Sequence, residues 1–501
     1  MALRQFWVGG FNECKVYHHL VMTLLLFLTS VTSLESAAAP QGAKYPNEDW
    51  PTYGGDLGNT RFSTLSQINT TNVDKLEVKW VFRTGLGADP RVNFQVSPIV
   101  VDGIMYVSDP GHFGSLQQNL FALNARTGRQ IWHRQIQLLA SRDVDFLGNR
   151  PHRGVAYGDG KVYMATFDAR LWAFDAKTGR PVAAFSDGSS PSGGFVSVGR
   201  PELGHYLTAA PIFVPRALVP KGGPASGHDV VLMGLGGGEN GIRGYFSAYD
   251  ATNGRLLWRF FTAPEPVGEF AQSWPQNAGT PFENPHLRGG AAVWQAPAYD
   301  VERGLVILGT GNAAPDFDGT HRAGNNELAN AIVALNAATG QRVWHFQEVH
   351  HDIWDYDQAS PPVVYSMALD GRQRKVVSAA GKTGWNYILD RETGRPVYPC
   401  PETAVPTYTD VEAPDGMPEQ PSQTQPVCAS EAFVPQGDRV ANGQYISPIF
   451  TPPRSSAGIP AIDMLAVRDE GKWSRLVTQW LNRDFLVVQN CPRLLTIPSW
   501  D

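Results

Sequence analysis

Cysteine is scarce, with 4 among 501 residues, and the absence of a C-x-x-C-H motif excludes a covalently attached c-type haem within this sequence. Charged residues make up only 18% of the chain, and the net charge of -6 comes without a basic run or stripe. Because nucleic-acid-binding proteins cluster lysine and arginine, this composition excludes that class. Beyond residue 40, no apolar run approaches the ~20 residues that are needed to span a bilayer.

The longest apolar stretch runs from Leu20 to Leu34. Arg4 and Lys15 precede it, and the small residues S-A-A-A-P follow it at 36–40, which is the order of a secretory signal. A membrane anchor is the alternative, but the run is short and is interrupted by threonine and serine. We therefore expect residues 1–38 to be a signal peptide and the protein to be secreted, to the periplasm of a bacterium.

Two of the cysteines, Cys400 and Cys428, bracket a proline-rich stretch without hydrophobic periodicity. An exported protein can form a disulfide across such a loop, whereas two unpaired buried thiols are the alternative. We predict the disulfide, together with an inserted loop over residues 399–440.

Glycine and proline are abundant, with 51 and 38 residues, and many of the glycines belong to a repeated pattern. Each copy has an alternating apolar strand, Asp or Asn, a T-G or N-G turn, and a second strand that usually carries tryptophan. Glycine suits such hairpin turns because it adopts positive φ without strain. The turn glycines are Gly128, Gly179, Gly254, Gly340 and Gly394. Hairpins repeated at these intervals predict an all-β chain, folded as a β-propeller over residues 39–501.

A propeller does not by itself establish chemistry. A non-catalytic binding propeller could carry every one of these hairpins. The two interpretations differ in whether ionisable and metal-ligating residues converge at matching loop positions.

The segment D-W-P-T-Y-G-G-D-L-G-N-T-R-F-S, which begins at Asp49, and the hairpins resemble the alcohol and sugar dehydrogenases that depend on pyrroloquinoline quinone (PQQ). The resemblance extends to about residue 453 and implies an eight-bladed propeller that holds PQQ near its axis on a calcium or lanthanide ion. Residues 454–501 lack the glycine-rich strand and hairpins with which relatives close the ring. We expect this tail to be divergent or truncated, and in the second case the propeller is incomplete at its C-terminal end.

The run E-V-H-H-D-I-W-D-Y-D at 348–357 resembles the catalytic loop of that family. The resemblance assigns Asp355 as the catalytic base and Asp357 as a second carboxylate. In an extended segment residues i and i+2 point the same way, so both could reach one cation. Glu239 and Asn312 complete the implied metal ligands, and such oxygen donors suit calcium or a lanthanide.

The histidines of this loop admit another interpretation. His350, His351 and Asp352 could form a zinc site, although no further His or Cys at ligand spacing supports it. A histidine pair before W-D-x-D is typical of the sugar-oxidising relatives. Many alcohol-oxidising relatives carry vicinal cysteines where this chain has Leu147-Gly148.

The resemblance also implies residues that hold the cofactor. Trp294 would form the flat floor under the quinone rings, Arg153 would pair with a PQQ carboxylate, and Lys382 would contact the quinone oxygens. Further contacts are assigned to Gln95, Thr208, Gly237 and Gly238. Plainer alternatives are a blade core residue for Trp294, a turn residue for Asn312 and a solvated residue for Glu239.

The implied activity is oxidation of a sugar, polyol or other alcohol to a carbonyl or lactone, with hydride transfer to PQQ and Asp355 as general base. The electron acceptor would be a separate molecule, cytochrome c or a quinone. The alternative is a catalytically inactive propeller that serves as a binding or assembly scaffold.

Overall fold

The computed structural model describes residues 49–86, 94–112, 115–139, 151–279, 282–316, 318–319, 321–404, 424–426 and 428. The predicted signal peptide, the tail at 454–501, Leu147-Gly148 and most of the loop at 399–440 lie outside the described residues. Within the described ranges, no helix has the length and apolarity that a membrane span requires.

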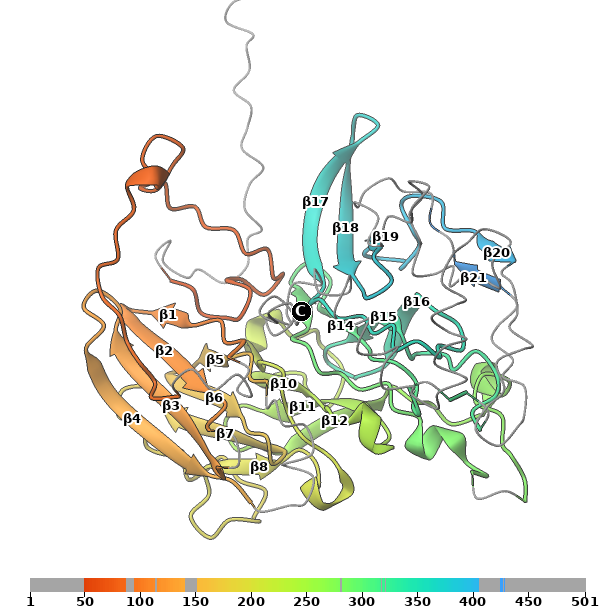
Figure 1. Cartoon of the computed structure of the whole chain (residues 1–501), viewed down its shortest axis with the longest axis horizontal. Coiled ribbons are helices and arrows are strands. Elements are labelled where there is room, and N and C mark those ends of the chain that lie inside the picture. Colours follow the sequence, from red (N-terminus) through yellow and green to blue (C-terminus); the bar gives the residue numbers. More distant parts are fainter. Residues whose placement is uncertain are drawn as a thin grey trace, which may run out of the picture. The chain divides into compact units, whose positions relative to one another are not determined.

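Antiparallel sheets make up nearly all of the regular structure, as the sequence predicts (Figure 1). The first sheet contains β1 (Ile99–Val101), β2 (Ile104–Asp109), β3 (Gln117–Asn124) and β4 (Gln130–Gln137). The second contains β5 (Val155–Gly158), β6 (Lys161–Ala165), β7 (Arg170–Asp175) and β8 (Phe195–Ser197). The third contains β9 (Ile212–Val214), β10 (Val230–Gly234), β11 (Tyr245–Asp250) and β12 (Leu256–Phe261).

The later sheets continue in chain order. The fourth contains β13 (Ala298–Asp300), β14 (Leu305–Gly309), β15 (Ala331–Asn336) and β16 (Arg342–Gln347). The fifth has three described strands, β17 (Val363–Leu369), β18 (Arg372–Ala380) and β19 (Asn386–Asp390). A short pair follows, β20 (Glu402–Ala404) and β21 (Thr424–Pro426). The described helices are 3-10 turns: η1 (Val73–Lys75), η3 (Pro201–Leu203), η4 (Arg216–Leu218), η5 (Gly238–Asn240), η6 (Gly268–Phe270) and η7 (Pro285–Arg288).

The repeated turns have a common local cause. In the first copy, Asn124 Oδ1 accepts hydrogen bonds from the backbone N–H groups of Arg126 and Thr127 and from the Thr127 hydroxyl. Gly128 then takes φ +69°, which closes the hairpin. The two copies with proline after the turn differ from the expected hairpin, because proline lacks the N–H that a return strand needs. There the return is a single bridge, Phe174 to Pro181 and Leu389 to Pro396.

Tryptophans on the outermost strands of the first, third and fourth sheets join each of these sheets to the next. The Trp258 indole N–H donates to the Ala337 carbonyl at 2.9 Å, and a Cβ on Gly340 would lie 2.6 Å from the Trp258 ring. The turn therefore requires glycine for two reasons. The backbone there has a positive φ, and a Cβ would collide with the tryptophan ring. Equivalent contacts link Trp132 to Ala176 and Gly179, and Trp344 to Arg391 and Gly394.

The hydrophobic core lies between neighbouring sheets. Val231 and Tyr249 of the third sheet pack with Tyr163 and Leu171 of the second, and similar clusters fill the other described interfaces. The first strands of successive sheets, β1 with β5, β5 with β9 and β13 with β17, contact one another. Sheets that follow one another with their first strands together form a β-propeller. The blade number of eight stays a prediction.

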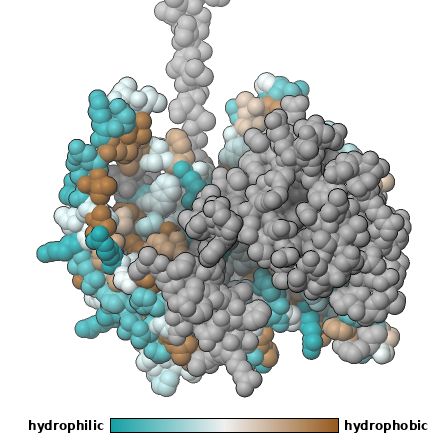
Figure 2. All heavy atoms as spheres, in the orientation of Figure 1, coloured by the Kyte–Doolittle hydropathy of each residue, from teal (hydrophilic) through white to brown (hydrophobic). Residues whose placement is uncertain are grey.

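Residues 61–82 leave much of their apolar surface exposed (Figure 2). Within this segment, Trp80 repeats the docking contact, since its indole N–H donates to the Ala125 carbonyl at 3.1 Å and its ring lies against Gly128. Residues 76–82 thus occupy the place of an outermost strand, and no neighbouring strand pairs with them among the described residues. The exposed apolar residues are Phe62, Leu65, Ile68, Val73, Leu76, Val78 and Val81.

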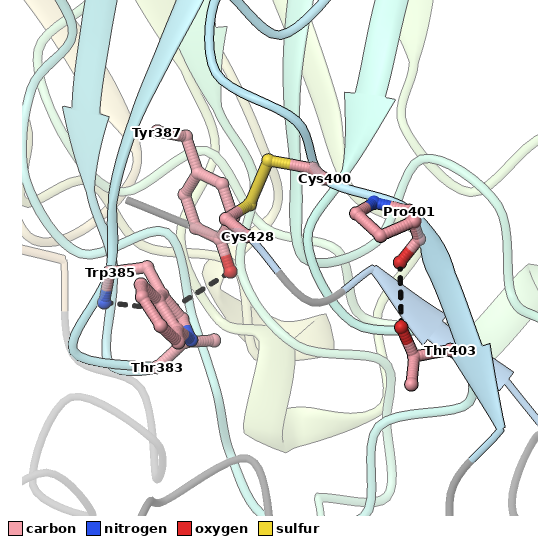
Figure 3. The surroundings of a disulfide bond; sticks show 7 residues. All are labelled: Thr383, Trp385, Tyr387, Cys400, Pro401, Thr403 and Cys428. Atoms are coloured by element: carbon pink, nitrogen blue, oxygen red, sulfur yellow. Dashed lines mark hydrogen bonds between the residues drawn. A yellow bond between two sulfur atoms is a disulfide. The ribbon is translucent and has the colours of Figure 1, made fainter. Parts of the chain in front are cut away.

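The predicted disulfide is confirmed, since Cys400 and Cys428 are bonded (Figure 3). Both sulfurs join the apolar cluster between the fourth and fifth sheets, where Tyr387 of β19 is also buried. The pair β20 and β21 lies directly beside the bridge in sequence, so the disulfide and this short pair together hold residues 400–404 next to residues 424–426 and 428.

Candidate functional site

Three of the predicted cofactor residues share one position in the repeat. Gln95, Thr208 and Trp294 each stand at the fourth position before the first strand of their sheet. Arg153 and Asp357 likewise precede β5 and β17.

Three more of the predicted residues follow the second strand of the third, fourth or fifth sheet. Glu239, Asn312 and Lys382 follow β10, β14 and β18. Because the first and second strands of each sheet are antiparallel, the start of one and the end of the other meet at the same edge. The repeat therefore gathers residues from five sheets at corresponding edges.

The centre of the site is an ion pair between two aspartates and a lysine. Lys382 Nζ lies 2.7 Å from Asp355 Oδ1 and 2.9 Å from Asp357 Oδ2. The other oxygen of Asp357 accepts the backbone N–H of Asn312 at 2.5 Å. A quarter of the Asp355 side chain is exposed, compared with 7% for Asp357. Asp355 is therefore the more exposed of the two carboxylates, and Asp357 is held by its neighbours.

The backbone presents Asp355 in an unusual conformation. Its φ is +63°, in the left-handed region that aspartate and asparagine tolerate better than most residues. Asp352 braces this turn, because its carboxylate accepts the backbone N–H groups of Trp354 at 2.9 Å and Tyr356 at 2.8 Å. Its second oxygen also accepts from the side chain of Asn330 at 2.7 Å.

These contacts do not support the zinc alternative. Asp352 is occupied by the turn, and His351 Nδ1 pairs with the Gly324 carbonyl at 2.7 Å. His350 contacts Gln347 at 2.6 Å and Glu402 at 3.0 Å. The three side chains therefore form hydrogen bonds with different neighbouring groups.

Burial and charge set the protonation of the central groups. Burial raises the pKa of Asp355 well above its ordinary value; Lys382 opposes this rise, whereas Asp357 and Asp316 add to it. Burial disfavours the charged form of Lys382, but the carboxylates of Asp355 and Asp357 outweigh it and raise the lysine pKa. Lys382 thus stays charged and helps Asp355 to ionise.

Asp316 is a member of the site that the sequence interpretation missed. Asn312 Nδ2 donates to Asp316 Oδ1 at 2.6 Å. Burial and the charge of Glu239 raise the pKa of Asp316 to about 6, despite the hydrogen bond from Asn312. An acidic residue four positions beyond Asn312, in the same turn, was the available signal.

Trp294, Arg153 and Thr208 contact one another. The Arg153 guanidinium carbon lies 4.8 Å from the centre of the Trp294 ring, and Nη1 donates to the carbonyls of Thr208 and Trp294. The Thr208 hydroxyl donates to the Trp294 carbonyl at 3.1 Å. Trp294 as a whole is partly exposed, and its ring lies beside the buried cation of Arg153. Gln95 Oε1 is buried without a hydrogen-bond partner among the described residues.

The glycine-rich turn around Gly237 is shaped mainly by the protein itself. Gly237 has φ +103°, and a Cβ there would lie 2.2 Å from the Gly204 carbonyl oxygen. A Cβ on Gly238 would meet only ordinary contacts, so the backbone is more open there. The turn leads to Glu239, whose Oε2 accepts the Tyr206 hydroxyl at 3.0 Å. The predicted cofactor contacts of both glycines stay predictions.

The predicted metal ligands are oxygen donors of the kind that hard cations prefer. Lys382 lies between two of them, and the described part of the chain holds no group of three or more His, Cys, Asp or Glu arranged to bind a metal ion. The chemical type of the donors fits the ion, and the ligand set stays a prediction. Its members are Glu239, Asn312, Asp355 and Asp357.

The family model "PQQ: Glucose/ethanol/alcohol dehydrogenase, beta-propeller domain" matches residues 50–451. The dehydrogenase subunit of alcohol dehydrogenase (quinone) from Gluconobacter oxydans (strain 621H) is 33% identical over 383 residues, which are 73% of this chain and 45% of the relative. Quinoprotein glucose dehydrogenase from Escherichia coli (strain K12) is 30% identical over 398 residues, 75% of this chain and 46% of the relative. The chain spans about half the length of the curated relatives it matches.

Solved structures confirm the propeller. The quinohemoprotein alcohol dehydrogenase ADHIIG from Pseudomonas putida HK5 has a TM-score of 0.57 at 31% identity, covering 75% of this chain and 51% of that chain. A europium-containing methanol dehydrogenase has a TM-score of 0.59 at 24% identity, covering 75% and 62%, and shows the fold alone.

Proposed function

Because the chain belongs to the β-propeller domain family of PQQ-dependent glucose, ethanol and alcohol dehydrogenases, we propose that it is a PQQ- and metal-dependent dehydrogenase. Its substrate would be a sugar, a polyol or another alcohol, and its product a carbonyl compound or lactone. The observation that carries this proposal is the partly exposed Asp355 held by Lys382.

The cofactor would lie against the ring of Trp294, a residue that is partly exposed. Arg153 is a buried cation at the same ring and suits the carboxylates of PQQ. Thr208 and Gln95 offer polar atoms at the same edge, and the unsatisfied Gln95 oxygen needs a donor. Lys382 would contact the quinone oxygens of PQQ. Gly237 and Gly238 would border the cofactor, with Gly238 the more open of the two.

When bound, PQQ supplies the hydride acceptor, and calcium or a lanthanide held by Glu239, Asn312, Asp355 and Asp357 supplies a Lewis acid. Asp355 would take the proton from the substrate hydroxyl as general base. Lys382 favours the charged form of that carboxylate and orients it before the substrate arrives. Asp357 stays behind it, bonded to the backbone of Asn312.

The substrate class is inferred from the sequence of the catalytic loop and from the name of one relative. The histidine pair at 350–351 favours a sugar or polyol over a simple alcohol, and one relative is a glucose dehydrogenase by name. Cytochrome c or a quinone would re-oxidise the cofactor. The enzyme would be secreted to the periplasm, and both the oxidation of the substrate and the re-oxidation of the cofactor would take place there.

Asp355→Asn tests the proposal. Asparagine accepts the left-handed conformation at φ +63° but cannot take a proton as a carboxylate does. We expect the purified protein, loaded with PQQ and Ca²⁺ or a lanthanide, to reduce a dye with sugars or alcohols. The variant should bind PQQ and lose activity by at least about 100-fold. A variant with near-normal activity would contradict the mechanism, and a folded wild-type protein that binds no PQQ would favour the scaffold alternative.

A further inference from the structure

A fully buried carboxyl group lies behind the site and has no role in the chemistry above. Glu348 directly follows β16, is 1% exposed, and donates its backbone N–H to the Asn330 carbonyl at 2.7 Å. Neither carboxyl oxygen has a hydrogen-bond partner among the described residues. An ionised carboxylate is strongly disfavoured in such surroundings, so the group needs a proton of its own or a cation.

A second unsatisfied oxygen lies next to Glu348. Gln358 Nε2 donates to the carbonyls of Ser360 at 2.8 Å and Ala380 at 3.2 Å, which leaves Oε1 buried without a donor among the described residues. Glu348 Oε2 and Gln358 Oε1 lie 2.5 Å and 3.0 Å from the position that a Cβ on Gly381 would take. Both acceptors therefore border the same small space beside Gly381, and a protonated Glu348 would supply the donor that Gln358 Oε1 lacks.

We propose that Glu348 is a neutral carboxylic acid whose hydroxyl donates a hydrogen bond to Gln358 Oε1 and so positions the central ion pair. Gln358 directly follows Asp357, and Gly381 directly precedes Lys382. The backbone N–H of Lys382 also donates to the Asp357 carbonyl at 3.0 Å. Glu348 therefore braces the junction of both segments and is a positioning residue, since it acts through Gln358.

The charges around Glu348 agree with a neutral acid. Burial, and then the negative charge of Asp357, raise the pKa of Glu348 well above its ordinary value. Burial raises the pKa of Tyr387, which is therefore neutral as well, and its hydroxyl pairs with that of Thr383 at 3.1 Å (Figure 3). The positive charge of Lys382 is directed to the two aspartates of the ion pair. Among the described residues, no cation forms an ion pair with Glu348.

A matched pair of substitutions separates the protonated acid from an ionised one. Glu348→Gln keeps the shape and a donor for Gln358, whereas Glu348→Leu is of similar size but leaves the Gln358 oxygen unsatisfied. We expect the melting temperature to be unchanged in Glu348→Gln and several degrees lower in Glu348→Leu. At pH 8 the wild-type infrared spectrum should contain a protonated-carboxyl band that is missing from Glu348→Gln.

The positioning role rests on the function proposed above, but the protonation of Glu348 does not. In protein loaded with PQQ and Ca²⁺, Glu348→Gln should keep the wild-type kcat and pH profile, and Glu348→Leu should lower kcat about tenfold. A missing infrared difference, or a pH profile shifted by Glu348→Gln, would show an ionised carboxylate and overturn the proposal. If no variant binds PQQ, the proposed function fails, and the infrared and melting results still decide the state of Glu348.

Discussion

At the scale of single residues, the properties of the site depend on the protonation of several neighbouring carboxyl groups. Asp355, Asp357 and Asp316 influence one another, and Lys382 is the cation among them. A base with a raised pKa is active only above that pKa. Activity should therefore fall as the pH decreases through the range in which Asp355 takes up its proton.

Asp316→Asn tests this interaction. Removing the negative charge of Asp316 should lower the pKa of Asp355, so the acidic limb of kcat/KM should move to lower pH. Asparagine keeps an oxygen for the hydrogen bond from Asn312. Asp370→Asn, at the exposed β17–β18 turn, is the matched control and should leave the profile in place. An unchanged profile in Asp316→Asn would show that Asp316 does not act on the base.

His152 links the fold to pH. Its Nε2–H donates to the Ala165 carbonyl at 2.8 Å and Nδ1 accepts from the Ser108 hydroxyl at 3.0 Å, so the ring is buried neutral. Burial lowers its pKa to about 4, from 6.5. Between these values the unfolded chain binds a proton that the folded chain does not, so stability present above pH 6.5 is lost as the pH falls.

His152→Gln should reduce this pH dependence. Between pH 7 and pH 5, the free energy of unfolding in urea should fall by about 2 kcal/mol less in His152→Gln than in the wild type. His112→Gln, at an exposed histidine, should match the wild type. Equal pH dependence in all three proteins would mean that His152 is not buried in its neutral form.

At the scale of elements, the hairpin repeat forms the sheets and also makes contacts between neighbouring sheets. The T-G turns with their Asp or Asn, and the tryptophans on return strands, could be predicted because they are local chemistry. At Pro181 and Pro396 the return strand is reduced to a single bridge because proline lacks a backbone N–H group. The repeat pattern alone does not reveal this difference. The packing of each tryptophan on the next turn, such as Trp258 on Gly340, required the structure because it joins two copies.

Gly340→Ala and Gly371→Ala measure the tryptophan contact separately from backbone strain. Both glycines have nearly the same φ, +72° and +71°, but a Cβ would lie 2.6 Å from the Trp258 ring at Gly340 and meet nothing within 4 Å at Gly371. Gly371→Ala should cost about 1 kcal/mol of unfolding free energy. Gly340→Ala should cost about 3 kcal/mol because the Trp258 ring must also move. Equal losses in urea unfolding would contradict the docking role.

At the scale of the whole molecule, much of the site inventory could be read from the sequence, but not its connections. Corresponding edges of the sheets bring Asp355, Asp357 and Lys382 together as their motifs indicate. Sequence motifs do not contain the distances that place Lys382 between the two carboxylates, or that add Asp316 and Glu348. These relations join loops from different sheets, so they depend on tertiary packing.

The central claim is that these edges form a PQQ site with Trp294 as its floor. Equilibrium binding of PQQ, with Ca²⁺ or a lanthanide present, to the folded wild-type protein and to Trp294→Leu tests it most directly. The account predicts one bound PQQ per chain and an affinity about tenfold weaker in the variant, because the flat aromatic surface is lost. Equal affinity in both proteins, or no binding to the folded wild type, would contradict it.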